Sequence, residues 1–277
     1  MKFINFIEGD IKNISFLLLG TVFSKGSAII ANIILALLLV PEDFGGFSKY
    51  VASTVIFSSI CGPWITEVYL RVKSNTKDIS KLVFSLYFIS GISSSLLLFF
   101  WFVFLDSSFS LNHIMFICPF LISMINAYEF EYRKNSRFKY CAIAEVYQSI
   151  FNGFFAVLFA FFLGGGISLI FGFLIGLIGK LCYLIFNSSH IKISLIPSFY
   201  LMKPELNDLK WSFLNKFSST FLANIDYLLV GILLNQHFAG LYYFIFNFSA
   251  QVLRVFSNNS TKVFYSSIIK SSNGVKV

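Results

Sequence analysis

Charged residues are scarce in this chain of 277 residues: 12% are Asp, Glu, Lys or Arg, while 57% are hydrophobic. A water-soluble protein of this size needs a charged surface that so few ionisable residues cannot supply. The sequence therefore excludes a soluble globular protein. The mean hydropathy of +0.78 and the 37 phenylalanines indicate instead that lipid is the solvent for most of the surface.

Cysteine and histidine are also few, with four and three residues. All four cysteines fall within apolar stretches, show no CxxC spacing and have no clustered His or Asp nearby, which argues against disulfides and metal sites. No glycine-rich phosphate loop, nucleophile elbow or carboxylate pair occurs in a polar segment. We therefore expect no catalytic residues, no metal and no cofactor, and do not expect an enzyme.

Apolar stretches of about 20 residues, long enough to cross a bilayer as helices, occur eight times. They cover approximately residues 15–40, 47–65, 82–105, 111–128, 141–163, 167–187, 211–234 and 238–257. Their length excludes an outer-membrane barrel, and backbone groups in lipid must bond within a helix. The predicted fold is all-α and polytopic: a six-helix lobe over 1–187, a cytoplasmic linker over 188–210, and an incomplete second lobe of two helices and a tail over 211–277.

Lysine and arginine are unevenly divided between the connections. Sixteen lie on one side of the predicted membrane and only Lys49 lies on the other, while the remaining four lie inside spans. Because basic residues stay in the cytoplasm, both termini are predicted to be cytoplasmic. This basic rim explains the net charge of +8 without nucleic acid as a partner.

An internal repeat relates the first two spans to the last two. Residues 40–47 align with residues 234–241 at an offset of 194, with a phenylalanine and a glycine in register. The same offset carried into the membrane pairs polar residues with each other: Thr21 with Asn215, Lys25 with Ser219, and Asn32 with Asp226. An even number of crossings separates the two copies, so they have the same orientation, as in two-lobed transporters.

The polar residues of each copy share one helical face, since the steps from Thr21 to Lys25 and Asn32 are four and seven residues. Such residues can simply help helices associate. Lys25 and Asp226 are different, because ionisable groups at that depth cost several kcal/mol unless they face a cavity or a partner. Two interpretations stay open for them: functional residues, or a structural Lys25–Asp226 pair.

Other residues within the spans have simpler interpretations. Lys180, Lys216 and Arg254 lie near span ends, where their side chains can reach the headgroups. Pro63 after Gly62 predicts a kink in the second span. The GxxxG of residues 172–176 predicts a close helix contact in the sixth.

Three stretches carry a resemblance to a known family: residues 35–47, residues 137–143, and residues 224–231 followed by 239–242. They are similar to the bacterial polysaccharide transporter family, which includes the O-antigen flippases of the multidrug/oligosaccharidyl-lipid/polysaccharide exporter superfamily. The resemblance implies two six-helix bundles around a central cavity. It also implies ion-coupled movement of undecaprenyl-pyrophosphate-linked oligosaccharide across the inner membrane, for O-antigen (lipopolysaccharide) or capsule synthesis.

Members of that family have twelve or fourteen spans, so a chain with eight is expected to be a truncated member that lacks four helices of its second lobe. With this function, Lys25 is expected to contact the pyrophosphate, because a cation offsets its desolvation. Asp226 is expected to couple transport to an ion. The other expected substrate-binding residues are Asn32, Ser219, Lys216 and Arg254.

Alternative functions remain open. The chain could be a non-transporting remnant or assembly partner, or a drug or ion antiporter of the same superfamily, whose cavity would favour acids and aromatics over lysine. An oligosaccharide polymerase would carry a sizeable, arginine-containing external loop, and no such loop is present. The expected partners are lipid-linked oligosaccharide, membrane lipid, and a polysaccharide polymerase or a chain that supplies the missing half-lobe.

Overall fold

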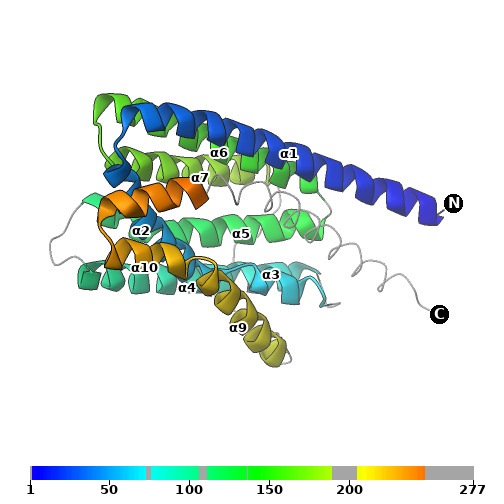
Figure 1. The fold of residues 1–277 in the computed structure, drawn as a ribbon. Coiled ribbons are helices and arrows are strands. Elements are labelled where there is room, and N and C mark those ends of the chain that lie inside the picture. Colours follow the sequence, from blue (N-terminus) through cyan, green and yellow to red (C-terminus); the bar gives the residue numbers. More distant parts are fainter. Residues whose placement is uncertain (1, 73–75, 106–110, 136, 189–204, 247–277) are drawn as a thin grey trace.

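The structure, a computed structural model, describes residues 2–72, 76–105, 111–135, 137–188 and 205–246. Every regular element in these ranges is helical (Figure 1). The first nine elements, which we call the first lobe, are α1 (Lys2–Leu38), α2 (Pro41–Ser58), η1 (Ser59–Cys61), α3 (Trp64–Tyr69), α4 (Thr76–Leu105), η2 (Leu111–Ile117), α5 (Cys118–Lys134), α6 (Phe138–Phe162) and α7 (Ile167–Phe186). After the linker come α9 (Leu206–Leu222), α10 (Ile225–Leu233) and a helical segment over residues 236–246.

Six of the described helical stretches are long and apolar enough to cross a membrane. They are Phe16–Leu38, Pro41–Tyr69, Asp78–Phe104, Leu111–Lys134, Phe138–Phe162 and Ile167–Phe186. These coincide with the first six predicted spans. The prediction of a polytopic helical membrane protein is therefore confirmed.

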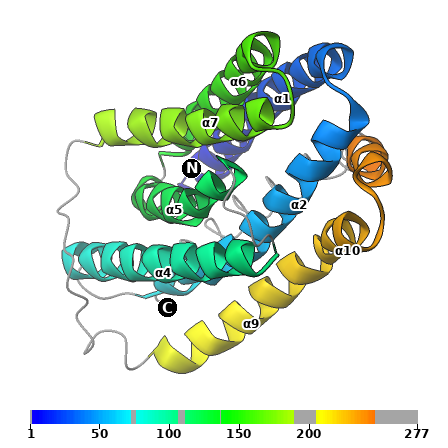
Figure 2. The same ribbon diagram turned by 90° about the vertical axis from the view of Figure 1, so that its left-hand side faces the viewer.

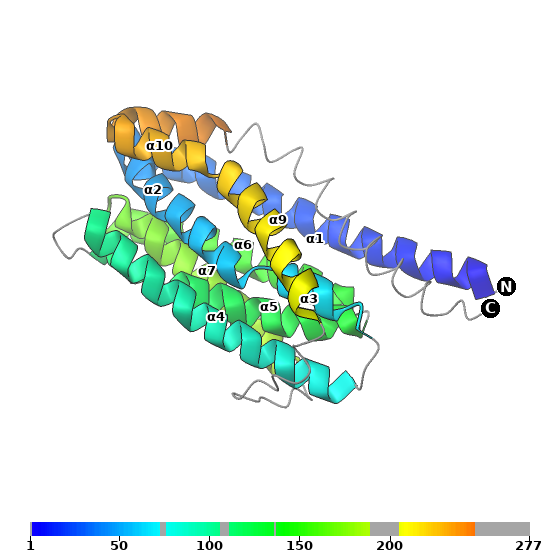
Figure 3. The ribbon, with the colours of Figure 1, turned by 90° about the horizontal axis from the view of Figure 1, so that it is seen from below.

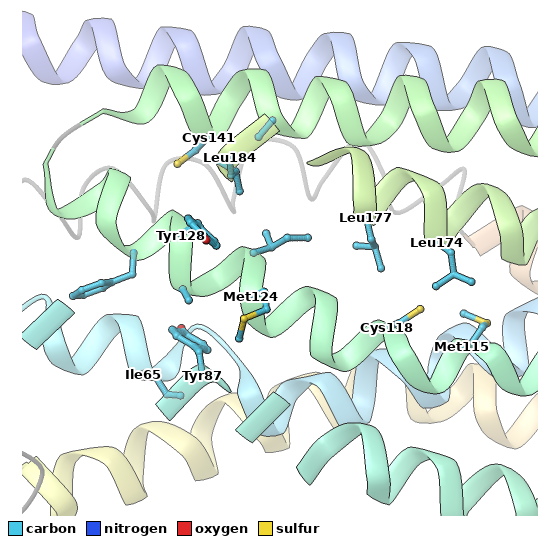
Figure 4. Packing of buried hydrophobic residues seen from close by; sticks show 14 of the residues in the cluster. Ile65, Tyr87, Met115, Cys118, Met124, Tyr128, Cys141, Leu174, Leu177 and Leu184 are labelled. Atoms are coloured by element: carbon cyan, nitrogen blue, oxygen red, sulfur yellow. The ribbon is translucent and has the colours of Figure 1, made fainter. Parts of the chain in front are cut away.

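The helices of the first lobe pack around α5. α6 lies between α1 and α7, and α5 packs against both α7 and α4 (Figure 2). Buried side chains of α5, such as Met124 and Tyr128, meet Tyr87 of α4 on one side (Figure 4). Leu177 and Leu184 of α7 belong to the same hydrophobic cluster, which holds these helices together.

Glycine sets the distance between α6 and α7. A Cβ atom at Gly172 would lie 2.5 Å from the Cβ of Ala156, and one at Gly176 would lie 2.8 Å from the Cβ of Asn152. The predicted close contact at the GxxxG is therefore confirmed. Gly164 and Gly165, with φ of 65° and 68°, let the chain reverse between the two helices, because these left-handed conformations carry no steric penalty in glycine.

The second span is interrupted where the sequence predicts a kink. α2 ends at Ser58, the chain tightens into η1, and α3 starts at Trp64 after Gly62 and Pro63. Gly62 is extended, with ψ of 178°, and Pro63 cannot donate the backbone hydrogen bond that would continue the helix. The kink is confirmed as a full break between two helices.

The seventh span differs from the prediction of one continuous helix over residues 211–234. α9 starts earlier, at Leu206, and ends at Leu222, and α10 begins at Ile225. The Asn224 side-chain amide donates to the Thr220 backbone oxygen at 2.7 Å, which satisfies a carbonyl that the broken helix leaves open. α9 packs against α3 and α10 against α2, so this interrupted span lies along the interrupted second span (Figure 3).

Candidate functional site

A cavity of about 490 Å³ lies between α2 on one side and α9, α10 and the 236–246 helix on the other. We call it the α2–α9 cavity. Small and polar side chains dominate its lining: Ser48, Val51, Ala52, Val55, Ser219, Thr220, Ala223, Asn224, Tyr227 and Tyr243. None of these described lining residues carries a formal charge.

The cavity exists because both facing spans are interrupted and carry small residues there. The break at Ala223 and Asn224 turns the end of α9 and the start of α10 toward the space beside α2. Ser48 and Ala52 on α2 leave room that larger side chains would fill. Irregular backbone at membrane depth is tolerated where it lines a cavity inside the protein, and it is the usual way that transporters build a site.

One end of the cavity lies near the start of the two repeated helices, and each start is capped. At α2, Pro41 occupies the first turn and the Asp43 carboxylate accepts from the Val40 N–H at 3.2 Å. At the 236–246 helix, the Asn235 side-chain oxygen accepts from the Phe238 N–H at 3.0 Å. The repeated sequence motif is therefore, in both copies, a helix start.

The two copies of the motif pack directly against each other. A Cβ atom at Gly45 would lie 1.9 Å from the Gln236 backbone oxygen, and one at Gly240 would lie 1.8 Å from the Pro41 backbone oxygen. Each glycine thus meets the start of the other helix, so the contact is nearly reciprocal, as at a two-fold axis. We call this the motif contact.

A polar interaction accompanies the motif contact. The Glu42 carboxylate lies 2.8 Å from Nδ1 of His237, and both side chains are about half exposed. The two residues occupy almost equivalent positions in the two copies of the repeat. The internal repeat found in the sequence therefore corresponds to a physical contact between the starts of α2 and the 236–246 helix.

A second polar contact joins the other halves of the same spans. Lys216 Nζ on α9 lies 2.9 Å from the Glu67 carboxylate on α3. Lys216 is one helical turn before Ser219, which lines the cavity. The Lys216–Glu67 ion pair therefore lies just outside the uncharged lining of the cavity.

Residues 34–275 match the family whose description is polysaccharide biosynthesis protein, and this range covers most of the chain. The chain belongs to this family. The resemblance to polysaccharide transporters is thereby confirmed at the level of the family, and with it a role in polysaccharide biosynthesis or export. No curated protein and no solved structure matches the chain.

The predicted site residues on the last helices of this polysaccharide biosynthesis protein lie in or beside the cavity. Ser219 lines it, and Lys216 lies one turn away. Asp226, in the first turn of α10, accepts a hydrogen bond from the Tyr242 hydroxyl at 2.6 Å. Among the residues that the structure describes, Asp226 forms no ion pair with Lys25, so the structural pair left open by the sequence is not formed.

The predicted site residues on α1 lie elsewhere. Lys25 and Asn32 are partly buried on α1, which packs along α6, and neither belongs to the described lining of the cavity. Thr21 of the same stripe lies 3.4 Å from the Glu145 carboxylate on α6, so part of the stripe serves helix association. Arg254 lies outside the described residues.

Sequence reasoning missed most of the cavity lining, including Ser48, Asn224, Tyr227 and Tyr243. Asn224 and Tyr227 belong to a stretch that carries the family resemblance, and an asparagine in an apolar span was an available signal. The other lining residues gave no such signal in the sequence, because serine, alanine and tyrosine are common in membrane helices.

The expectation that the Lys180 side chain reaches the lipid headgroups is wrong. It is 8% exposed, and its Nζ lies 2.9 Å from Glu129 on α5, which also binds Arg133. Glu129 is therefore held between two cations inside the helix bundle. Glu129 and Arg133 are four residues apart on α5, a spacing from which this cluster could have been suspected.

Proposed function

We propose that this polysaccharide biosynthesis protein is a transporter that moves undecaprenyl-pyrophosphate-linked oligosaccharide across the bacterial inner membrane, for O-antigen or capsule synthesis. The α2–α9 cavity carries this proposal, because it offers about 490 Å³ of polar-walled space between two interrupted membrane helices. Polar groups inside a membrane are costly and are found where a substrate or ion passes. Part of the headgroup of the lipid-linked substrate occupies this space, while its lipid tail stays in the bilayer.

The residues expected from the sequence keep their roles in this proposal. Lys25 on α1, outside the α2–α9 cavity, contacts the pyrophosphate at another stage of its movement than Lys216 beside the cavity, with Asn32, Ser219 and Arg254 as further substrate contacts. Asp226 couples transport to an ion. Its Oδ1 atom is buried without a hydrogen-bond partner among the described residues, which supports an ion-binding role.

A drug exporter is the second transport class, and the lining of the cavity argues against it. A cationic drug is best held by carboxylates and aromatic faces. Tyr227 and Tyr243 give the cavity aromatic faces, but no carboxylate belongs to its described lining, and its other polar residues are hydroxyls and an amide. These groups suit a sugar headgroup better than a cation.

Orientation is part of the proposal. Both termini are cytoplasmic, and the motif contact lies on the external side. Reporter fusions after Lys139 and Asn273 should read cytoplasmic, and fusions at Asp43 and His237 should read external. An external signal at Lys139 would reverse the orientation.

The transport activity can be tested with the purified chain in liposomes that contain fluorescent undecaprenyl-pyrophosphate-linked oligosaccharide. The chain should move this lipid between leaflets faster than protein-free liposomes do. Lys25→Ala should abolish movement at unchanged membrane abundance, and Lys25→Arg should keep part of it, because the charge survives while its geometry changes. Movement no faster than in protein-free liposomes would contradict the proposed function.

A further inference from the structure

Two serine hydroxyls in the walls of the α2–α9 cavity use their donor protons on the protein itself. Ser48 Oγ donates to the Gly45 backbone oxygen at 2.8 Å, and Ser219 Oγ donates to the Lys216 backbone oxygen at 3.0 Å. Asn224 uses one amide proton on the Thr220 backbone oxygen. The lone pairs of both serine hydroxyls and the Asn224 carbonyl oxygen remain as acceptors, and the second Asn224 amide proton remains as a donor, so the uncharged walls can both accept and donate hydrogen bonds.

This balance discriminates between the two polar parts of a lipid-linked oligosaccharide. A pyrophosphate is anionic and offers only acceptor oxygens, so it needs donors and cations. The described lining has no cation, and its serine protons are already used. A sugar ring is uncharged and carries several hydroxyls that both donate and accept, which match uncharged walls that offer acceptors and donors.

Aromatic side chains form another part of the lining. The rings of Tyr227 and Tyr243 lie 5.7 Å apart at an interplanar angle of 64°, and Tyr227 is buried. Val51 and Val55 of α2 add apolar surface. A pyranose has apolar C–H faces as well as hydroxyls, and it therefore suits a pocket that combines aromatic surface with a few polar groups.

Lys216 lies next to the cavity on α9, on the side where the pyrophosphate of the same substrate would lie. Lys216 precedes Ser219 by one turn, about 4.5 Å along the helix axis. Its ammonium group is paired with Glu67 and about a third exposed, outside the cavity lining. Lys216 therefore places a cation about one helical turn beyond the neutral lining on α9.

We propose that the α2–α9 cavity is a saccharide site. It binds an uncharged sugar of the lipid-linked substrate through acceptors on Ser48, Ser219 and Asn224 and through the faces of Tyr227 and Tyr243. The pyrophosphate lies outside the cavity, on the side of Lys216. This assignment rests on the proposed function and adds to it which part of the substrate the cavity recognises.

Binding of two probes to the purified full chain tests the assignment. One probe is undecaprenyl pyrophosphate that carries a neutral trisaccharide, and the other is undecaprenyl pyrophosphate without sugar. The chain should bind the first probe about tenfold more tightly, the equivalent of one or two net hydrogen bonds. Asn224→Leu and Ser219→Val should remove this preference while affinity for the sugar-free probe is kept.

Two matched variants control for the loss of a side chain that bonds its own helix. Asn187 donates to the backbone oxygen four residues earlier at 2.9 Å, as Asn224 does, and Ser93 donates to the oxygen three residues earlier at 2.9 Å, as Ser219 does. Both control residues are exposed and lie on α4 or just after α7, away from the cavity. Asn187→Leu and Ser93→Val should keep the full preference.

The outcomes separate the saccharide site from the proposed function. Equal binding of both probes by the unmodified chain would overturn the saccharide site and leave the proposed function standing. Cavity variants that bind both probes equally more weakly, or that keep the preference for the sugar-bearing probe, would also overturn the saccharide site and leave the proposed function standing. Failure to bind either probe would overturn both. Ser219 is exposed, so Ser219→Val gives a folded variant even if Asn224→Leu does not.

Discussion

Two glutamate–lysine pairs with the same separation of 2.9 Å show how differently the two regions of the molecule are held. Glu129 and Lys180 join α5 to α7 inside the first lobe, where both side chains are at most 10% exposed. Glu67 and Lys216 join α3 to α9, where the side chains are 31% and 37% exposed. The same chemistry is part of a sealed core in one region and of an open contact in the other.

Hydrophobic packing shows the same contrast. One cluster of buried residues extends from Leu17 on α1 to Leu184 on α7, and the only residue of α9 in it is Leu209. A second, small cluster joins Ala52 and Ile56 of α2 to two residues of α10. The first lobe is therefore the more tightly packed region, and the last helices are attached to it mainly through α2 and α3.

The largest expected effect comes from the sealed pair. Glu129→Leu leaves Lys180 and Arg133 buried without the carboxylate that they share, which should cost about 3–5 kcal/mol of unfolding free energy. Glu67→Leu should cost only about 0–1 kcal/mol, because its pair is partly exposed. Denaturant unfolding of the purified protein in detergent measures both. Equal losses in the two variants would contradict the contrast between the regions.

Asp226 provides the next test, because Tyr242 ties α10 to the last described helix through it. Tyr242→Phe removes the donor to Oδ2 and should lower the unfolding free energy by about 1.5–3 kcal/mol. Tyr147→Phe, on an exposed face of α6, should change it by less than about 0.5 kcal/mol.

Asp226→Asn keeps a hydrogen-bonding group, so substrate binding should persist while ion-driven turnover is lost. Unchanged turnover in that variant would exclude Asp226 from ion coupling.

The motif contact offers a comparison between neighbouring glycines. A Cβ at Gly45 meets the backbone of Gln236, whereas a Cβ at Gly46 meets nothing within 4 Å. Gly45→Ala should therefore push the two helix starts apart at a cost of about 1–3 kcal/mol, and Gly46→Ala should not. The cost of Gly45→Ala should be smaller than that of Glu129→Leu, because the motif contact belongs to the loosely held last helices.

Cross-linking measures that separation directly. A chain with Glu42→Cys and His237→Cys should form a disulfide, in a Cys182→Ser background because Cys182 is the exposed natural thiol. Adding Gly45→Ala should reduce the yield, and adding Gly46→Ala should leave it unchanged. Equal yields in both variants would show that the glycine contact does not hold the two helix starts together.

Much of the fold could be predicted because the bilayer acts on each helix separately. A span must be apolar over about 20 residues and must bond its own backbone, so the first six spans are legible from composition alone. The kink at Gly62 and Pro63 and the close contact at Gly172 were predictable for a similar reason, since backbone chemistry decides them locally. The repeat also related residues 40–47 to residues 234–241, which the structure places in contact.

The sequence by itself determined the class of protein, the positions of those spans and the family. Only the tertiary structure decided which polar residues meet. Lys180 looks like a residue that reaches the headgroups until Glu129, far away in the chain, is placed beside it. The break at Asn224 turns the ordinary residues Ser48, Ser219 and Tyr243 into the lining of one cavity. The physical reason is that a single helix does not encode which neighbour will bury or satisfy its polar face, and that choice is made when the helices pack.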